Sequence, residues 1–414
     1  MSNGLVVVGG SYAGLQVAAS AREFGYSEPI RLIAGEPALP YQRPPLSKGY
    51  LTGKTTPAML PLRGEAFYRD ASIDVELGRH ALRIDPHSRS VELSDGRKVR
   101  YDRLVLATGA RPRPLPVPGG DLDGVVALRS LADADRLRAL AAEARSVVVV
   151  GGGFIGLEVA SALVSADRSV TVVEAADRLM ARAVPPVLSD FFADLHRARG
   201  VRLKLGCGVT ALSGVNGRVA EVLCGDGTVE PADLVVVGIG VVPNVELAQD
   251  LGLPCNDGIL VDGFARTAVS GVFAAGDCAR QPHPHAASPT VRLESVQNAI
   301  EQGKAAASVL AGSPAANGAV PWFWSDQYDV KLQMAGLPQG SDRVAVRGAV
   351  EEGKFSVFHF RAGRLVGVDS VNRPAEHMLA RKLLAAGVAL TPEQAADTAF
   401  DLRGALAPSA DMSP

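Results

Sequence analysis

The segment Ser146-Val-Val-Val-Val-Gly151-Gly-Gly153-Phe-Ile-Gly156 decides the fold of this chain. An apolar strand runs into a glycine turn, and the next residues, Leu157 to Val164, have the pattern of a helix. Glycine at 151, 153 and 156 lets the backbone approach a pyrophosphate, and the helix N-terminus offers unpaired N–H groups. A second β-branched strand ends at Glu174, roughly 20 residues after the first glycine, where a carboxylate can accept ribose hydroxyls. These features predict a dinucleotide-binding domain.

The side chain at position 174 also indicates which nicotinamide dinucleotide binds. A carboxylate there repels a 2′-phosphate, and no arginine follows directly after Glu174 to attract one. We therefore expect NADH rather than NADPH. The alternative is that Glu174 only ends a strand at the surface.

A similar unit stands near the N-terminus, so the chain contains an internal duplication. Leu5-Val-Val-Val-Gly9-Gly-Ser11-Tyr-Ala-Gly14 is again a strand that enters a glycine turn, and Leu15 to Phe24 has the pattern of a helix. Both copies continue into a β-branched strand ending near an acid, an Asp-Gly turn and an apolar strand that closes on glycine. Landmarks that recur in one order are stronger evidence than one motif. We expect an α/β fold with two Rossmann-like dinucleotide-binding domains.

The first turn departs from the usual pattern at one position. Ser11 stands where the second glycine belongs, which adds a side chain at the closest approach to a phosphate. Its hydroxyl can donate a hydrogen bond there. The alternative is a structural turn without a ligand.

Composition restricts the class of protein. The chain has 414 residues, 47% hydrophobic and 21% charged, which fits a globular protein of two or three domains. Its formal net charge of −2 gives no global field that would attract nucleic acid or anionic lipid. The longest apolar runs are interrupted by glycine and are too short to span a membrane, and the N-terminus does not have the pattern of a signal peptide. We expect a cytoplasmic protein with neither nucleic acid nor membrane as a partner.

Cysteine usage argues against a metal site. The four cysteines, Cys207, Cys224, Cys255 and Cys278, show no Cys-x-x-Cys spacing and no nearby histidine pair. We therefore expect no metal, iron–sulfur cluster or disulfide framework, so redox chemistry would need a bound cofactor. Cys278 is interpreted as a small buried filler.

Four further segments are distinctive: Pro40-Tyr-Gln-Arg43-Pro-Pro-Leu-Ser-Lys48, Val272-Phe-Ala-Ala-Gly276-Asp277-Cys278, Leu293-Glu294-Ser-Val296-Gln-Asn-Ala-Ile-Glu-Gln-Gly303 and Pro321-Trp-Phe-Trp324-Ser-Asp-Gln-Tyr328. Together they resemble one family, the FAD-dependent NADH:ferredoxin reductases of the putidaredoxin reductase and biphenyl dioxygenase type. The resemblance runs from Leu5 to about Arg373. It implies a glutathione-reductase-like fold, in which an NAD domain interrupts an FAD domain and a C-terminal α+β domain follows.

The family arrangement suggests where the domains divide. The FAD domain would comprise residues 1–113 and 245–320, the NAD domain 114–244 and the C-terminal domain 321–414. Both crossings fall in proline-marked segments, Arg111-Pro-Arg-Pro-Leu-Pro and Val242-Pro-Asn.

The resemblance also implies which residues contact FAD. Besides Gly9, Ser11 and Gly14 of the first turn, these are Ala13, Gly35, Glu36, Arg43, Lys48, Ala81, Arg129, Asp277 and Val296. Gly35 stands where some relatives carry an acid, which leaves Glu36 as the expected ribose carboxylate. The helix after Glu294-Ser-Val296 would direct its N-terminus at the flavin and stabilise negative charge there.

Two charged residues are the expected catalytic pair. Glu158 lies in a helix start that otherwise is apolar, and a buried carboxylate needs a partner. In the family the matching glutamate pairs with the lysine that matches Lys48, beside the flavin. The alternatives are a solvated loop lysine and a glutamate that caps or complements the helix N-terminus.

The resemblance implies a flavoprotein that takes a hydride from NADH onto FAD and passes single electrons to a [2Fe–2S] ferredoxin. That ferredoxin would serve a cytochrome P450 or a ring-hydroxylating oxygenase. A docking rim of Arg63, Lys304 and Trp324 is expected, although packing at a domain interface is the alternative for Trp324. Rubredoxin remains an alternative acceptor, and an NADH-responsive binding protein like the apoptosis-inducing-factor flavoproteins remains an alternative function. No cysteine precedes Cys207, which excludes thiol chemistry at the first flavin loop.

Overall fold

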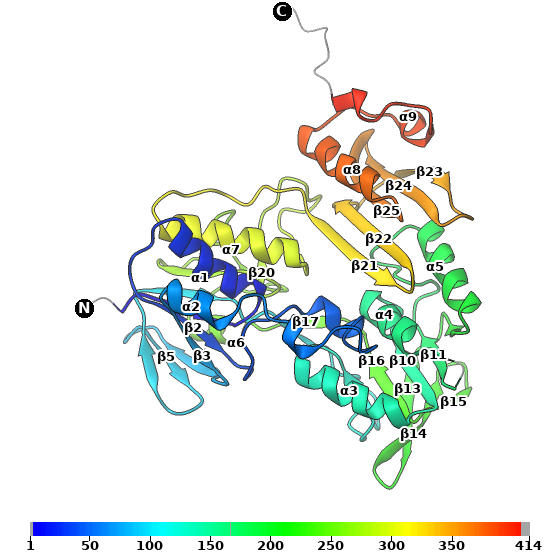
Figure 1. The fold of residues 1–414 in the computed structure, drawn as a ribbon, viewed down its shortest axis with the longest axis horizontal. Coiled ribbons are helices and arrows are strands. Elements are labelled where there is room, and N and C mark those ends of the chain that lie inside the picture. The colour runs from blue at the N-terminus through cyan, green and yellow to red at the C-terminus, as the bar shows by residue number, and fades with distance from the viewer. Residues whose placement is uncertain (1–2, 166, 407–414) are drawn as a thin grey trace, which may run out of the picture.

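The computed structural model describes residues 3–165 and 167–406. Its three large sheets are two parallel sheets and one antiparallel sheet, with helices packed against them (Figure 1). This architecture confirms the predicted α/β class with two Rossmann-like units and a C-terminal α+β part.

The N-terminal parallel sheet has the strand order β19-β7-β1-β2-β3. Leu5 pairs with Ile30 on one side and Arg103 on the other, so β1 is central and its carboxyl end meets the glycine turn. Helices α1 and α7 pack against each other beside this sheet (Figure 1). The bounds are β1 (Leu5–Val8), α1 (Tyr12–Glu23), β2 (Ile30–Ala34), β3 (Ile73–Leu77), β7 (Arg103–Leu106), β19 (Val272–Ala274) and α7 (Val296–Leu310).

Helix α1 begins earlier than expected, at Tyr12 instead of Leu15. Ser11 is its N-cap in an extended conformation, so the helix starts directly after the turn. The backbone N–H groups of the first helical turn therefore lie within the glycine segment itself.

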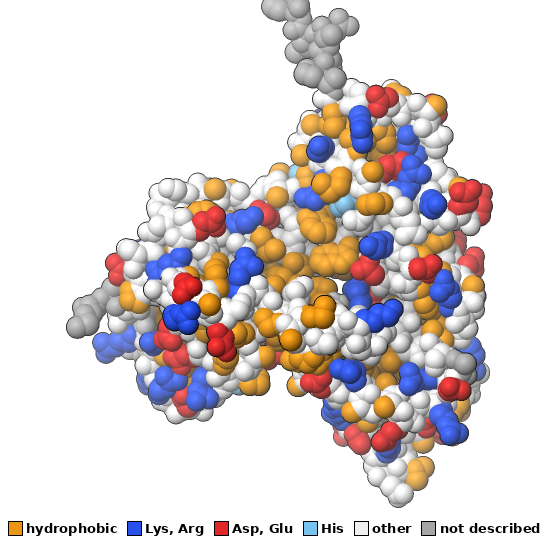
Figure 2. Space-filling view, in the orientation of Figure 1, with side chains coloured by type: hydrophobic (Ala, Val, Ile, Leu, Met, Phe, Trp, Pro, Cys, Tyr) orange, Lys and Arg blue, Asp and Glu red, His pale blue; other side chains and the backbone are white. Residues whose placement is uncertain are grey.

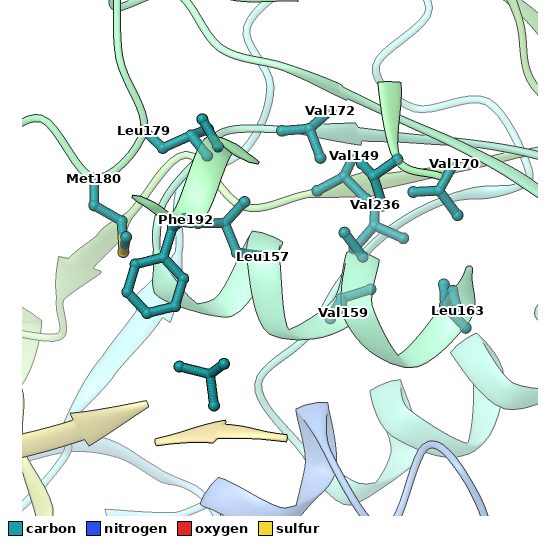
Figure 3. Close-up of a cluster of buried hydrophobic side chains, with 14 of the residues drawn as sticks. Val149, Leu157, Val159, Leu163, Val170, Val172, Leu179, Met180, Phe192 and Val236 are labelled. Carbon is teal, nitrogen blue, oxygen red and sulfur yellow. The ribbon is translucent and has the colours of Figure 1, made fainter. Parts of the chain in front are cut away.

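The second parallel sheet has the order β12-β11-β10-β16-β9 and repeats this plan. Its central strands β11, β10 and β16 are buried along most of their length, and Figure 3 shows Val149, Leu157 and Phe192 in one apolar cluster. The same cluster continues into Val330 and Phe355 of the C-terminal sheet, which joins the two parts. The bounds are β9 (Val125–Ala127), α3 (Leu131–Glu143), β10 (Ser146–Val150), α4 (Phe154–Leu163), β11 (Ser169–Val173), α5 (Pro186–Ala198), β12 (Arg202–Lys204) and β16 (Leu234–Val237).

The C-terminal sheet is antiparallel, in the order β21-β22-β25-β24-β23, and β21 lies beside α4 and α7. Helices α8 and α9 pack against this sheet (Figure 1). The bounds are β21 (Trp322–Gln327), β22 (Val330–Gly336), β23 (Arg343–Ala349), β24 (Lys354–Arg361), β25 (Arg364–Val371), α8 (Pro374–Ala386) and α9 (Pro392–Ala396).

Smaller elements complete the fold. Strands β8 and β17 pair antiparallel at the two proline-marked crossings, Pro112 opposite Val241. No helix within the described residues is both long enough and apolar enough to cross a membrane. The remaining bounds are η1 (Pro44–Ser47), η2 (Pro57–Met59), α2 (Glu65–Asp70), β4 (Ala81–Asp85), β5 (Ser90–Leu93), β6 (Lys98–Arg100), β8 (Ala110–Pro112), β13 (Val209–Val215), β14 (Arg218–Cys224), β15 (Val229–Pro231), β17 (Val241–Pro243), α6 (Glu246–Asp250), β18 (Ile259–Leu260), β20 (Ala279–Arg280) and η3 (Gly404–Leu406).

Candidate active site

A cavity of about 1140 Å³, which includes space open to solvent, lies where the two parallel-sheet units and the C-terminal sheet meet. Figure 2 shows hydrophobic side chains gathered in the middle of the molecule, between its lobes. The first glycine turn, the η1 loop, the end of β19, the start of α7 and strand β21 all contribute to the wall. Nine of the residues predicted from the sequence line it: Ser11, Ala13, Arg43, Lys48, Arg129, Glu158, Asp277, Val296 and Trp324.

The first turn is shaped by two glycines that do not tolerate a side chain. Gly9 has a φ of +123°, and a Cβ on Gly14 would lie 1.9 Å from the carbonyl oxygen of Gly9. The turn and α1 therefore approach each other closely, as a pyrophosphate-binding loop requires. Ser11 Oγ accepts a hydrogen bond from Arg43 Nε at 3.3 Å, which ties the turn to the η1 loop.

Arg43 is held by several groups behind the turn. Its guanidinium contacts Glu36 Oε1 at 2.5 Å and donates to the carbonyl oxygen of Arg129 at 2.7 Å. Tyr41 donates its hydroxyl to the other oxygen of Glu36 at 2.5 Å. Glu36 follows strand β2, lies outside the cavity wall and is held in one orientation by these two contacts.

Two predicted FAD residues lie farther from the cavity. Gly35 packs against His80, because a Cβ on Gly35 would approach the imidazole to 2.7 Å. A side chain at this position would therefore require His80 to move. Ala81 begins strand β4 next to His80 and packs at the edge of a separate apolar cluster. Neither residue lines the cavity.

The end of β19 and the start of α7 supply a charged pair and a helix terminus. Arg129 Nη2 contacts Asp277 Oδ2 at 2.9 Å, and both side chains line the cavity. Helix α7 begins at Val296, and Ser295 caps it by accepting from the Asn298 backbone N–H at 3.1 Å. The helix N-terminus therefore contributes partial positive charge to the cavity wall.

Lys48 and Glu158 form the predicted ion pair, with Lys48 Nζ 2.7 Å from Glu158 Oε2. Glu158 is only 1% exposed and lies in the second turn of α4, which contradicts a capping role at the helix N-terminus. Lys48 is 19% exposed on its side chain, so it is not a solvated loop lysine. The pair connects the η1 loop of the first unit with the helix that follows the second glycine turn.

Two serines that the sequence analysis missed complete the shell around Glu158. Ser47 Oγ donates to Glu158 Oε2 at 2.5 Å, and Ser325 Oγ donates to Oε1 at 2.6 Å. Ser47 directly precedes Lys48, and Ser325 directly follows Trp324, so both stood within segments already singled out. No sequence pattern relates either serine to Glu158, because both contacts depend on how the η1 loop and β21 pack against α4.

The second glycine turn repeats the geometry of the first. Gly151 has a φ of +108°, and a Cβ on Gly156 would lie 2.2 Å from the Gly151 carbonyl oxygen. Gly153 is the N-cap of α4 and has open space around it. Glu174 accepts from the backbone N–H of Gly152 at 2.6 Å. A carboxylate at the mouth of this turn can still accept ribose hydroxyls, because it offers about four acceptor positions.

The expected docking residues differ in their placement. Trp324 lines the cavity, with its ring centroid 5.5 Å from that of Trp322. Arg63 is exposed over the ring of Phe67, and Lys304 is exposed on α7, where it pairs with Glu301 at 3.1 Å. Arg63 and Lys304 do not line the cavity, so any role for them lies outside its wall.

Burial strengthens the preference of a phenol at the turn for its neutral form. Tyr12 lines the cavity, and burial raises its pKa to about 12 although Arg43 opposes the shift. Tyr12 is therefore neutral near pH 7 and offers an O–H donor.

Two dinucleotide turns and a shared cavity with a buried lysine–glutamate pair define an oxidoreductase that binds two dinucleotides. The chain belongs to the pyridine nucleotide-disulphide oxidoreductase family, whose model matches residues 3–303, and a reductase C-terminal model matches residues 322–406. Despite the family description, none of the chain's four cysteines lines the cavity.

Individual relatives are similar over nearly their whole length. Rhodocoxin reductase of Rhodococcus erythropolis is 50% identical over 403 residues, which cover 97% of this chain and 94% of the relative. The ferredoxin reductase of the CYP199A2 system from Rhodopseudomonas palustris has a TM-score of 0.95 at 44% identity, covering 98% and 100% of the two chains. The reductase in a covalent putidaredoxin reductase–putidaredoxin complex has a TM-score of 0.94 at 40% identity, covering 98% and 99%.

The comparisons confirm the expected cofactors, because members of this family and the related ferredoxin–NAD reductases use FAD and NAD(H). The residues fit these groups. In each turn a Cβ on the first or the last glycine would collide with backbone atoms, so both turns are tight, and the cavity beside the first turn is lined by Arg43, Arg129 and the start of α7. These are the cations and N–H donors that a phosphate-bearing flavin nucleotide requires.

Proposed function

We propose that this chain takes a hydride from NADH onto FAD and delivers electrons singly to a [2Fe–2S] ferredoxin that serves a cytochrome P450 or ring-hydroxylating oxygenase. The observation that carries the proposal is the Lys48–Glu158 pair, which joins the first dinucleotide unit to the second at the wall of one cavity. FAD would supply the conversion of a two-electron donor into one-electron steps.

We assign the FAD to the first turn and its cavity. Gly9, Ser11, Ala13 and Gly14 would face its pyrophosphate, and Gly35 and Glu36 its ribose, with Ala81 nearby. Arg43, Lys48, Arg129, Asp277 and Val296 would contact the remainder, since all five line the cavity. Val296 stands at the N-terminus of α7, where the helix dipole favours negative charge.

We assign NADH to the second turn. Gly151, Gly153 and Gly156 would admit its pyrophosphate, and Glu174 would accept its ribose hydroxyls and disfavour NADPH. Ile155, which lies between Gly153 and Gly156 in the first turn of α4, is 46% exposed at the cavity wall. The nicotinamide could therefore reach the cavity from the side of the second unit.

The paired strands β8 and β17 support the domain division inferred from the sequence. Both chain crossings run side by side there, which is the arrangement expected when one domain is inserted into another. We propose 1–113 with 245–320 for the FAD domain, 114–244 for the NAD domain and 321–414 for the C-terminal domain. Residues 407–414 of the last range lie outside the described part.

Lys48 and Glu158 would act on the reaction as a unit. The carboxylate lies 2.7 Å from the ammonium and offsets the free-energy cost of burying it. Ser47 holds the carboxylate from the side of the first unit and Ser325 from the C-terminal sheet. The lysine N–H donors are thereby kept at a constant position at the cavity wall.

The ferredoxin would approach over a rim that includes Arg63, Lys304 and Trp324. Trp324 lies at the cavity wall, while the two cations lie outside it and could steer an acidic partner. We place the reaction in the cytoplasm.

The acceptor decides between the proposal and its alternatives. Steady-state NADH oxidation should be measured while [2Fe–2S] ferredoxins and rubredoxins are titrated separately. Saturable acceleration by a ferredoxin supports the proposal. Acceleration by rubredoxin alone would identify a rubredoxin reductase, and indifference to both would favour an NADH-responsive binding protein.

A further inference from the structure

A row of hydrogen-bonded polar side chains leads from Glu158 toward the surface. We call Glu158, Ser325, Gln327, His196 and Tyr328 the row. Ser325 and Gln327 lie on β21, and His196 lies on α5. Glu158 is 1% exposed and the other three are 0% exposed. The row ends at Tyr328, in the turn after β21, where Arg199 stacks over the ring at 5.0 Å.

Every neighbouring pair in this row is within hydrogen-bond distance. Ser325 Oγ is 2.6 Å from Glu158 Oε1, and Gln327 Nε2 is 3.3 Å from Ser325 Oγ. His196 Nε2 is 2.8 Å from Gln327 Oε1, and Tyr328 Oη is 3.2 Å from His196 Nδ1. The four contacts connect α4, β21 and α5, elements that are far apart in the sequence.

The chemistry of the groups fixes the direction of these hydrogen bonds. An ionised carboxylate only accepts, so Ser325 must donate its single proton to Glu158. Ser325 can then only accept from Gln327, which requires the amide nitrogen to face the serine. The amide oxygen of Gln327 therefore faces His196, and His196 must carry its proton on Nε2.

The far end of the row agrees with this direction. Burial lowers the pKa of His196, which favours the neutral ring. A neutral ring protonated on Nε2 has a lone pair on Nδ1, which accepts from Tyr328 Oη. All four hydrogen bonds thus point toward Glu158.

We propose that Ser325, Gln327 and His196 are positioning residues that hold the Glu158 carboxylate oriented toward Lys48. Aligned donors polarise one another, so the row stabilises the anion more than Ser325 would alone. Without the His196 donor, the Gln327 amide is free to turn its oxygen toward Ser325. The serine proton is then shared between two acceptors, and the anchoring of Glu158 weakens.

The inference rests on the proposed function only where it predicts an effect on flavin reduction. The donor direction is tested on unmodified oxidised holoprotein by ¹⁵N NMR of labelled histidines at pH 7. A neutral His196 protonated on Nε2 is expected. A ring protonated on Nδ1, or a charged ring, overturns the proposal whatever the enzyme reduces.

Stopped-flow flavin reduction by NADH, the flavin midpoint potential and thermal unfolding are measured together on variants. His196→Leu removes the donor and should slow reduction about threefold to tenfold, the range that one neutral hydrogen bond gives, and should shift the potential. His196→Gln keeps an N–H donor and should restore both values. Ser325→Ala should reproduce the effect of His196→Leu.

A matched control separates positioning from general destabilisation. His359 lies in the C-terminal sheet, is 2% exposed and pairs at 2.7 Å with Asp369, which is not a member of the row. His359→Leu should lower the unfolding temperature and leave the reduction rate and the potential unchanged. If His196→Leu behaves like this control, or His196→Gln fails to rescue, the proposal is wrong. If wild-type protein is not reduced by NADH at all, the proposed function is wrong, and the NMR result still decides the direction of the row.

Discussion

Replacing Glu174 by glutamine should change which nicotinamide dinucleotide the protein prefers. In the structure the two carboxylate oxygens accept from the backbone N–H groups of Gly152 and Ala176, at 2.6 and 2.8 Å. A carboxylate has about four acceptor positions, so about two remain for ribose hydroxyls. Glutamine removes the charge and replaces one acceptor oxygen by an NH₂ donor. This NH₂ group faces either a backbone N–H group, where no hydrogen bond can form, or the ribose, where an acceptor is lost.

The size of the effect follows from these contacts. Loss of one hydrogen bond to a charged group costs about 1.5–3 kcal/mol, which corresponds to a decrease of about 10- to 100-fold in kcat/KM for NADH. NADPH should gain in relative terms, because two unit charges about 4 Å apart repel by about 4 kcal/mol at an effective dielectric constant of 20. The ratio of kcat/KM for NADH to kcat/KM for NADPH should therefore fall by a larger factor than kcat/KM for NADH itself.

Initial rates with a saturating artificial acceptor give kcat/KM for NADH and NADPH in wild type and Glu174→Gln. Glu230→Gln is a matched control, because Glu230 is a largely buried glutamate of the same unit that pairs with Arg202 and Lys204. It should leave the ratio unchanged. An unchanged ratio in Glu174→Gln, or a wild type with larger kcat/KM for NADPH, would refute the assignment.

Four other substitutions test other parts of the site and the proposed docking rim. Glu158→Gln should leave FAD bound but lower the free energy of unfolding by several kcal/mol, since it leaves Lys48 without its buried partner. It should also change the rate of flavin reduction or the flavin midpoint potential. Unchanged chemical denaturation curves and stopped-flow traces would argue against the pair. Arg63→Glu or Lys304→Glu should raise the KM for ferredoxin without altering flavin reduction by NADH. In wild type, 1 M salt should also raise the KM for ferredoxin, because the Debye length shrinks to about 3 Å. A KM that changes with neither substitution nor salt would place the docking face elsewhere. Gly14→Ala should yield protein without bound FAD, as its Cβ would lie 1.9 Å from a carbonyl oxygen of the turn; a fully yellow variant would contradict the close approach.

Much of the fold was accessible from the sequence because the duplicated unit repeats strong local signals. Continuous valine runs predict strands buried on both faces, and β1 and β10 are such strands. The start of α1 was less accessible. Its residues before Leu15 are small or aromatic, and only the extended conformation of Ser11 shows that the helix begins directly after it.

The site was accessible only in part. A carboxylate within an apolar helix signals a buried partner, and the sequence analysis matched Glu158 with Lys48 through the family resemblance. Ser325 and His196 were not accessible, because their contacts depend on how the C-terminal sheet packs against α4 and α5. Nothing local in either segment specifies that packing. The contact of Gly35 with His80 likewise joins residues that no local pattern relates.

The measurement that tests the central claim most directly is the NADH-dependent reduction of cytochrome c with and without a [2Fe–2S] ferredoxin. FAD in the cavity beside Lys48 and Glu158 should accept electrons from NADH but pass them efficiently only to a protein carrier that docks at the rim. The account predicts slow reduction without the ferredoxin and a large, saturable increase when it is added. Equal rates with and without the carrier, in protein whose flavin NADH does reduce, would contradict it.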